Sequence, residues 1–332
     1  MFAFRHIDQH FGSTFRRAMN VRSGLCALVL SVAALSVPAG AGEVVHIVVP
    51  APPGGDLDVT ARALGQRLGE LTGDSYVVEN RPGANTAIGT EYVVRAAADG
   101  NVWLYNGAAM VVYPWLQKMS FSPLEDLRPV VQISRTRYVL VVAPESAIGS
   151  ARDLVKYAAQ LPQGLNCAAA PGPMGMACDQ LAALTGRKVT SVPFGGIAPA
   201  VQALMGGHVD LMFVSVAAVE PLIRTAKLRV IAASSSAAGG NVPLIGELWP
   251  GFVLEGFTGL LVPAKTAPEK ISQINAQVNR VLREPQFSAA LRDAGQEEVG
   301  GTAEQYSHQL NSTYRRYGEL VRNLGLDTRP PN

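Results

Sequence analysis

The segment between residues 44 and 71 places the strongest constraint on the fold. Val44–Val49 has the continuous apolar pattern of a buried strand, and residues 50–55 (PAPPGG) have the composition of a turn. Beyond this turn, apolar side chains recur at helical spacing, at Leu57, Ala61, Leu64, Leu68 and Leu71. The pattern predicts a strand, a glycine-containing turn and a helix in direct succession.

Such an arrangement can bind an anion. The first N–H groups of a helix have no partner within it, and the helix macrodipole favours negative charge at that end. Gly54 and Gly55 lack a Cβ atom, so a ligand can approach their backbone closely. The alternative is an ordinary strand-to-helix connection that Asp56 or Asp58 caps, and the residues alone leave both interpretations open.

The first 41 residues have the features of a secretory signal peptide. Four arginines precede an apolar run from Leu25 to Val37, and the small residues 39–41 (AGA) offer a cleavage site. The run is shorter than the ~20 residues that a membrane-spanning helix needs. We therefore expect a signal peptide over residues 1–41, with Met1 or Met19 as its start, and an exported protein from residue 42.

Charge and cysteine content narrow the class of protein further. Residues 1–41 carry four arginines and one aspartate, which leaves 24 basic and 25 acidic residues in the rest of the chain. With a net charge near −1, that part has no global field to attract nucleic acid or an anionic membrane. Cys167 and Cys178, eleven positions apart, either form a disulfide or remain two buried thiols.

After the opening helix, strands and helices alternate. Strand patterns at 76–78 and 102–105 flank a helical pattern at 88–98, which predicts a parallel sheet with helices on its faces. Ligands bind to such sheets at the carboxyl ends of the strands. Three loops meet that condition, at residues 53–58, 81–86 and 106–110.

A second alternating unit follows. Strands are expected at 139–142, 165–169, 189–193, 209–213 and 228–233. Helices are expected at 150–160, at 199–205 and at 219–226, and a further helix, before the strand at 189–193, ends at 184. The end of the chain has a strand pattern at 253–262 and helical patterns at 268–282, 286–294 and 303–324.

We expect these last helices to pack on the first unit. The predicted lobes are residues 42–141 plus 255–332, and residues 142–254. Two crossovers, near 138–143 and 252–258, would then form a hinge, with a ligand cleft between two α/β lobes.

The residue types that catalysis needs do not assemble into a recognisable set. Beyond residue 41 the histidines are His46, His208 and His308, each isolated in the sequence. HExxH, CxxC, GxSxG and phosphate-binding glycine motifs are absent from the sequence. The sequence therefore favours a binding protein without cofactor or metal over an enzyme, and a periplasmic hydrolase is the weakest of the functions considered.

Several blocks, in order, resemble one known family. These blocks are IVVPAPPGGDLDVTAR, VVENRPGANTAIG, VPFGGIAPAVQALMGGHVDLMF and EEVGGTAEQY, and the resemblance spans about residues 44–324. They are similar to the Bug family, the TctC-like periplasmic receptors of tripartite tricarboxylate transporters. The resemblance implies a periplasmic-binding-protein-like (type II) Venus flytrap of two α/β lobes. It further implies a monomer that captures a small carboxylate and hands it to a membrane permease.

The resemblance also implies which residues contact the ligand. In this sequence they are Pro53, Gly54, Gly55, Asp56, Asp58, Asn85, Thr86, Gly107, Ala108, Met174, Phe194, Gly196, Ile197 and Ser215. The proline-glycine loop would hold a ligand carboxylate through backbone N–H groups and ordered water. Asp56 departs from the family, in which a glycine or another small residue is usual.

Two further departures concern the segments in which the family is rich in hydroxyl groups. They read Ala108-Ala109-Met110 and Pro173-Met174-Gly175-Met176 in this chain. Methionine offers an adaptable apolar surface. We therefore expect a monocarboxylate, or a carboxylate with an apolar or aromatic body, in preference to citrate. The alternative function is that of a periplasmic ligand-sensing input to a membrane sensor protein.

Overall fold

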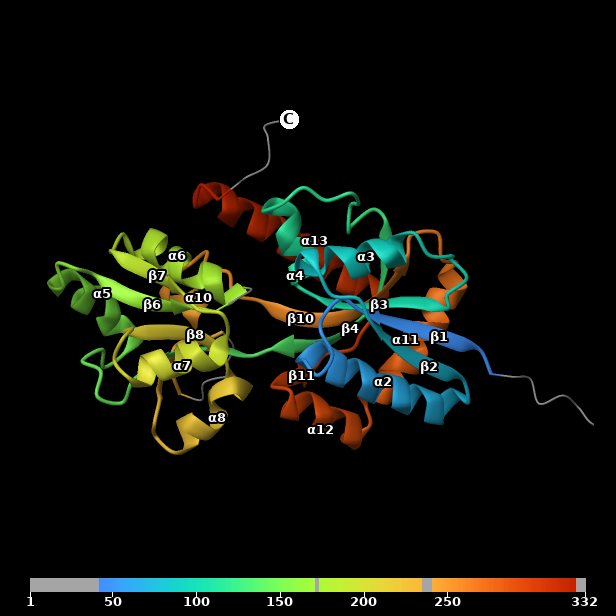
Figure 1. The fold of residues 1–332 in the computed structure, drawn as a ribbon, viewed down its shortest axis with the longest axis horizontal. Coiled ribbons are helices and arrows are strands. Elements are labelled where there is room, and N and C mark those ends of the chain that lie inside the picture. Colours follow the sequence, from blue (N-terminus) through green and yellow to red (C-terminus); the bar gives the residue numbers. More distant parts are fainter. Residues whose placement is uncertain (1–41, 171–172, 235–240, 327–332) are drawn as a thin grey trace, which may run out of the picture. The chain divides into compact units, whose positions relative to one another are not determined.

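The computed structural model describes residues 42–170, 173–234 and 241–326. The predicted signal peptide, residues 1–41, lies outside these ranges. The described residues form two β-sheets with helices packed on them, which is the expected α/β architecture (Figure 1). We call the six-stranded sheet with its helices the first lobe and the five-stranded sheet with its helices the second lobe.

The first lobe contains the strand-turn-helix unit at the start of the described chain. Its sheet has the order β11-β4-β10-β3-β1-β2, in which β1 runs parallel to β2 and β3 while β10 runs antiparallel to β3 and β4. The strands are β1 (Val44–Val49), β2 (Ser75–Asn80), β3 (Val102–Gly107), β4 (Leu127–Thr136), β10 (Gly256–Pro263) and β11 (Gln296–Glu298).

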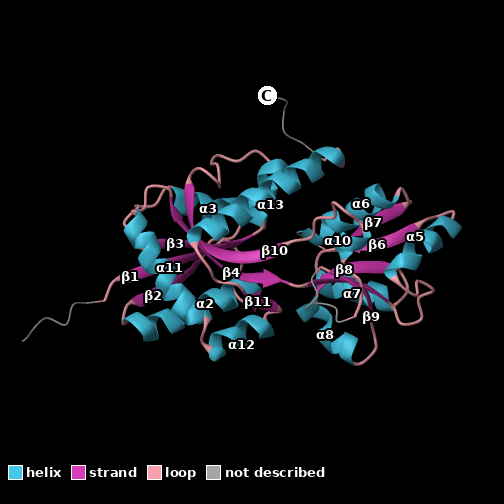
Figure 2. Cartoon of the chain, turned by 180° about the vertical axis from the view of Figure 1, so that it is seen from behind, coloured by secondary structure: helices cyan, strands magenta, loops and turns pink. Residues whose placement is uncertain are grey.

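Helices cover both faces of this sheet (Figure 2). One face packs against α2 (Asp56–Thr72), α11 (Pro268–Leu282) and α12 (Pro285–Asp293), and the other against α3 (Ala87–Val94), α4 (Ala109–Val112) and α13 (Ala303–Asn323). The alternation of side chains along each strand supplies both cores. In β1, Ile47 and Val49 enter the first core and Val48 enters the second.

The second lobe has one continuous hydrophobic core. Its strand order is β7-β6-β8-β5-β9, where β6 is parallel to β7 and β8, and β5 is antiparallel to β8 and β9. The strands are β5 (Tyr138–Val142), β6 (Leu165–Ala169), β7 (Val189–Pro193), β8 (Leu211–Ser215) and β9 (Arg229–Ala233). The helices are α5 (Ala151–Gln160), α6 (Pro173–Thr185), α7 (Ile197–Met205), α8 (Val216–Arg224) and α10 (Ile245–Leu248).

A disulfide joins Cys167 on β6 to Cys178 on α6, with Cα atoms 5.8 Å apart. Of the two alternatives for these cysteines, the structure therefore contains the bonded one. Both residues are fully buried. The bond fixes α6 to β6, the strand next to the edge strand β7.

The chain passes between the two sheets twice. Thr136, the last residue of β4, pairs with Gly256 in the first sheet, and Tyr138, the first residue of β5, pairs with Ser215 in the second. Arg137 alone separates the two pairings. All of β5 lies in the second sheet, so residues 138–141 group with the second lobe, and the predicted limit at 141/142 is better drawn at Arg137. The rest of the predicted lobe division remains a prediction.

Several predicted elements differ from the observed ones. Residues 106–110, predicted as a loop, contain the end of β3 and the start of α4. The helix predicted to end at 184 begins at Pro173 and ends at Thr185, and the strand predicted from 253 begins at Gly256. β4 and β11 have no counterpart in the prediction. The predicted helix 268–282, in contrast, is confirmed with both of its limits.

Candidate functional site

The predicted site residues of the first lobe share one edge of its sheet. Because β1, β2 and β3 are parallel, the loops that follow them leave from the same edge. Gly107 at the end of β3 pairs with Thr258, and Gly256 pairs with Thr136. The ligand loops of the first lobe and both crossovers therefore lie at a common edge.

The second lobe has the same arrangement. Parallel strands β6, β7 and β8 end at one edge, where Phe194, Gly196 and Ser215 follow them. The pairing of Ser215 with Tyr138 brings the first crossover to that edge. Each lobe thus turns its loop-bearing edge towards the crossovers. Topology therefore places the predicted residues of each lobe at the edge of its sheet from which the crossovers leave.

The proline-glycine loop joins β1 to α2. Gly54 has φ +82°, a left-handed conformation that favours glycine. Gly55 is the N-cap residue in an extended conformation, and its carbonyl accepts the first helical hydrogen bond, from Val59 at 2.9 Å. No side chain caps the helix. Of the two interpretations left open by the sequence, the one in which Asp56 or Asp58 caps the helix is therefore not the observed one. Residues 52–56 are exposed, so backbone N–H groups at this end are accessible.

The buried side chain of Asp58 holds this loop in place through hydrogen bonds. Its Oδ2 atom accepts the Gly54 N–H at 2.9 Å, and Oδ1 accepts the Asn80 amide at 2.8 Å. Arg62 donates to both oxygens, at 3.1 and 2.9 Å. Hydrogen bonds from Arg62, helped by those from Gly54 and Asn80, hold the pKa of Asp58 down at about 2.

These contacts give Asp58 a different role from the predicted one. A carboxylate has about four lone-pair sites, and four donors occupy them here. The residue is only 3% exposed. Asp58 therefore positions the loop, and no lone pair remains for the direct ligand contact that the sequence suggests.

The second loop is held in a strained conformation. Ala84, Asn85 and Thr86 have φ values of 45°, 52° and 77°, a left-handed run that non-glycine residues rarely adopt. Each such residue costs on the order of 1–3 kcal/mol and persists only where neighbours fix it, commonly at functional sites. Here Asn85 donates to Gln117 at 2.9 Å, and Gln117 donates to the Ala84 carbonyl at 3.1 Å.

Buried contacts tie this second loop to its neighbours. Thr90 on α3 donates to the Thr86 carbonyl at 2.8 Å, and the Asn106 amide donates to Thr90 at 3.1 Å. Gly89 lies against the first loop so closely that a Cβ atom would come within 2.8 Å of Pro50. The first and second loops are therefore packed as one unit.

The third predicted contact segment lies deeper than expected. Gly107 and Ala108 are buried, because the backbone of Phe257 passes close to them. The Ala108 N–H donates to the Phe257 carbonyl at 3.2 Å. Asn106, just before them, uses its side chain to accept the Gly107 N–H at 2.7 Å. These contacts explain why the strand continues through residues that look like a loop in sequence.

A small apolar cavity brings the two segments without hydroxyl groups together. It has a volume of about 110 Å³ and is lined by Ala109, Val112, Tyr113, Leu116, Pro173, Gly175 and Met176. One wall is α4 with the 3₁₀ turn Tyr113–Trp115, and the other is the start of α6. Met174, the predicted contact on α6, belongs instead to the core of the second lobe.

The other predicted residues of the second lobe lie at the edge where its parallel strands end. Phe194 donates its N–H to the Ala169 carbonyl at 3.0 Å and packs, with Ile197, against the lobe's core. Gly196 is the N-cap of α7 and Ser215 is the N-cap of α8. Neither cap makes a side-chain hydrogen bond to its helix.

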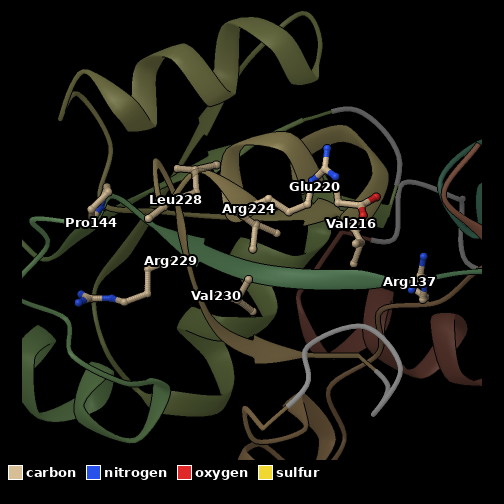
Figure 3. A pocket seen from close by; sticks show the side chains of 10 residues that line it. Arg137, Pro144, Val216, Glu220, Arg224, Leu228, Arg229 and Val230 are labelled. Atoms are coloured by element: carbon tan, nitrogen blue, oxygen red, sulfur yellow. The ribbon is translucent and has the colours of Figure 1, made fainter. Parts of the chain in front are cut away.

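Larger cavities lie beside the crossovers. One of about 280 Å³ is lined by crossover residues, among them Thr136, Glu255 and Gly256. Another, of about 570 Å³, lies between α8, β9 and Arg137 (Figure 3). In Figure 3 the Arg229 side chain points away from the centre of this cavity. That guanidinium donates to the Ser146 and Ile148 carbonyls at 2.8 and 2.9 Å.

Sequence reasoning missed the residues that position the loops. Asn80 and Thr90 act through side-chain hydrogen bonds to partners 22 and 16 positions away. Arg62 has the one recognisable signal, since it follows Asp58 by four residues on a predicted helix.

In residues 42–170, 173–234 and 241–326, no group of three His, Cys, Asp or Glu side chains could hold a metal ion. Within the same ranges, every helix is too short or too polar to cross a membrane.

Comparison with known proteins supports the arrangement. Residues 60–326 match the tripartite tricarboxylate transporter family receptor. Protein BugT of Bordetella pertussis is 30% identical over 299 residues, which cover 85% of this chain and 89% of BugT.

Two solved structures from Rhodopseudomonas palustris share the fold. One, solved with adipate, has 26% identity and a TM-score of 0.71, with 87% of this chain and 99% of that chain covered. The other, MatC with bound malate, has 25% identity and a TM-score of 0.67, with 86% and 99% covered. The fold and the family are those of periplasmic substrate-binding receptors with two lobes of type II topology. This chain belongs to the Bug (TctC-like) family of tripartite tricarboxylate transporter receptors.

Proposed function

We propose that the protein, exported to the periplasm by a signal peptide in residues 1–41, captures a small carboxylate between its two lobes and delivers it to a membrane permease. The accessible proline-glycine loop at the start of α2 carries this proposal. The Gly54 N–H is bonded to Asp58, but the N-cap Gly55 makes no side-chain cap, and negative charge is favoured at this end of a helix. The related structures with adipate and malate support a carboxylate as the ligand class.

The loop is also preorganised. Asp58 fixes Gly54, and the second loop is packed onto the first through Gly89. A site that is already ordered loses less conformational entropy when the ligand binds. The Asp58 network therefore supports affinity without contacting the ligand.

The apolar cavity between α4 and α6 supports a ligand with an apolar body. Burying a polar ligand group there without a partner would cost about 1–3 kcal/mol. Ala109 and Met176 offer carbon and sulfur surface in its place. We infer that a carboxylate with an aromatic or aliphatic body binds more tightly than citrate.

Calorimetric titration of the mature protein, residues 42–332, tests this function. The probes are citrate, malate, adipate and phenylacetate, with thermal unfolding as a second readout. A probe at a hundredfold excess over its Kd should stabilise the protein by ~2.7 kcal/mol. Adipate or phenylacetate should bind more tightly than citrate. Citrate as the tightest of the four would contradict the apolar-body inference, and no binding of any probe would contradict carboxylate capture.

The Gly55→Val variant locates the site. Gly55 has φ −80°, and an added Cβ would meet only the Pro52 carbonyl at an ordinary 3.7 Å, so the fold should survive. The valine side chain should block ligand approach to the loop and abolish binding. Gly246→Val is the matched control, because Gly246 is exposed and has open space around it. Retained affinity in folded Gly55→Val would move the ligand site elsewhere.

A further inference from the structure

Asp56 is the first helical residue of α2 and follows directly after the loop that would hold a carboxylate. It is exposed, and its side chain does not serve as the helix cap. Its backbone is fixed, because the Thr60 hydroxyl donates to the Asp56 carbonyl at 2.7 Å. The direction that its carboxylate faces therefore matters for what the loop can bind.

A chain of buried hydroxyl groups places this turn over the crossover strands. Tyr105 donates to Thr60 at 2.9 Å and lies 3.2 Å from the Thr258 hydroxyl. Thr258 and Gly256 are two apart on β10, so both face the side of the sheet that α2 covers. The first turn of α2 thus lies on the same face as Gly256.

The second lobe reaches that face through Tyr138. A Cβ atom on Gly256 would come within 2.5 Å of the Tyr138 hydroxyl, so this hydroxyl lies directly above Gly256. Tyr138 is the first residue of β5 and pairs with Ser215. The first turn of α2, which includes Asp56, and the hydroxyl of Tyr138 therefore lie on the same side of β10.

Electrostatics agree with this placement. Burial raises the pKa of Tyr138 to about 12, and the nearby charge of Asp56 makes a smaller contribution in the same direction. Partial desolvation raises the pKa of Asp56 itself. A carboxylate in that state is stabilised by a cation or a hydrogen-bond donor and destabilised by a second anion.

We propose that Asp56 selects a ligand that carries an ammonium group next to its carboxylate, which is the arrangement of an α-amino acid with an apolar side chain. The inference rests on the proposed function, since the loop at Gly54 and Gly55 must first hold the carboxylate. The ammonium group would bind Asp56, and the apolar side chain would extend towards Ala109 and Met176. A malonate-type ligand, with two carboxylates on one carbon, is disfavoured because one of them would face Asp56.

Three matched sets of probes differ only in the group on the carbon next to the carboxylate. They are alanine, propanoate and methylmalonate; leucine, 4-methylpentanoate and isobutylmalonate; and phenylalanine, 3-phenylpropanoate and benzylmalonate. Calorimetry compares the mature protein with Asp56→Asn, which keeps the side-chain shape and removes the charge. Asp293→Asn, at the exposed end of α12, removes the same charge elsewhere on the first lobe.

In at least one set, the amino acid should bind the wild-type protein roughly tenfold or more tightly than the malonate, the scale of one charged hydrogen bond. Asp56→Asn should remove that preference, and Asp293→Asn should keep it. A wild-type protein that binds the malonate as tightly as the amino acid, or an unchanged ratio in Asp56→Asn, overturns the inference but leaves carboxylate capture intact. If no probe of the three sets binds, the inference is overturned, and failure of citrate, malate, adipate and phenylacetate as well would also overturn the proposed function.

Discussion

The side-chain amide of Gln180 binds the backbone of Val253 through both of its groups. Nε2 donates to the Val253 carbonyl at 2.8 Å, and Oε1 accepts the Val253 N–H at 2.7 Å. Gln180 is fully buried on α6 of the second lobe. The second crossover is therefore attached to the second lobe as far as Val253.

Two residues later, the chain is attached to the first lobe. The Glu255 carboxylate accepts from Thr313 at 2.9 Å and forms an ion pair with Arg316 at 2.5 Å, both on α13. Leu254 lies between these two anchors, with its side chain in the core of the second lobe, and Arg137 lies between the two sheets in the first crossover. We propose that Arg137 and Leu254 absorb the backbone rotation when the lobes close.

Replacing Gln180 tests the anchor on the second lobe. Gln180→Leu keeps the side-chain volume but leaves the buried N–H and carbonyl of Val253 without their partner, which should cost about 1–3 kcal/mol of unfolding free energy. Urea unfolding of the mature protein measures this loss. Gln66→Leu is the control, because Gln66 is exposed and bonds only to Glu70 at 3.1 Å. A Gln180→Leu protein as stable as the control would show that the anchor contributes nothing.

The disulfide should stabilise the second lobe. Closing a loop of eleven residues restricts the unfolded chain, and the chain-entropy estimate for such a loop is about 3 kcal/mol. The double variant Cys167→Ala, Cys178→Ala should therefore unfold at a lower urea concentration than the oxidised wild-type protein. Because both cysteines are fully buried, a mild thiol reagent should leave the native bond intact. Equal stability of the double variant and the oxidised protein would contradict this account.

The Asp58 network gives a defined pH dependence. Its folded pKa of about 2 lies below the value of about 3.9 for a free aspartate, so the unfolded state binds the proton more readily. The resulting stabilisation, about 2 kcal/mol, is present above pH ~4 and is lost as the pH falls towards ~2. Asp58→Asn should lack it.

Unfolding of Asp58→Asn and wild-type protein at several pH values measures this difference. The stability gap between them should be largest near neutral pH and should narrow between pH ~4 and ~2. Asp293→Asn, which removes an exposed charge, serves as the control. A gap that stays constant down to pH ~2 would mean that the carboxylate charge of Asp58 is not what holds the loop.

Local structure with a strong pattern could be predicted from the sequence. The helix Pro268–Leu282 has a proline at its first position and a stripe that includes Ile274 and Val278, and both of its limits were predicted. The strand Val44–Val49 was predicted equally well, because it is a short apolar run next to a proline-rich turn. These signals are local, so the sequence alone carries them.

Features that depend on distant partners could not be predicted. β4 was missed because its pattern includes Pro129 and the buried polar residues Gln132 and Ser134, which read as a loop. The resemblance implied that Asp58 contacts the ligand, and only the fold shows that Asn80 and Gly54 occupy its oxygens. Asp56 was weighed as a helix cap, and only the fold shows that its charge adds to the rise in the pKa of Tyr138, on the other side of the crossover.

Solution scattering of the mature protein tests the central claim most directly. If loops from both lobes bind one carboxylate, saturation with the tightest of citrate, malate, adipate and phenylacetate should bring the lobes together and reduce the radius of gyration. The Gly55→Val variant should show no reduction at the same probe concentration. An unchanged radius of gyration in wild-type protein, at a saturation confirmed by calorimetry, would contradict closure around a carboxylate between the lobes.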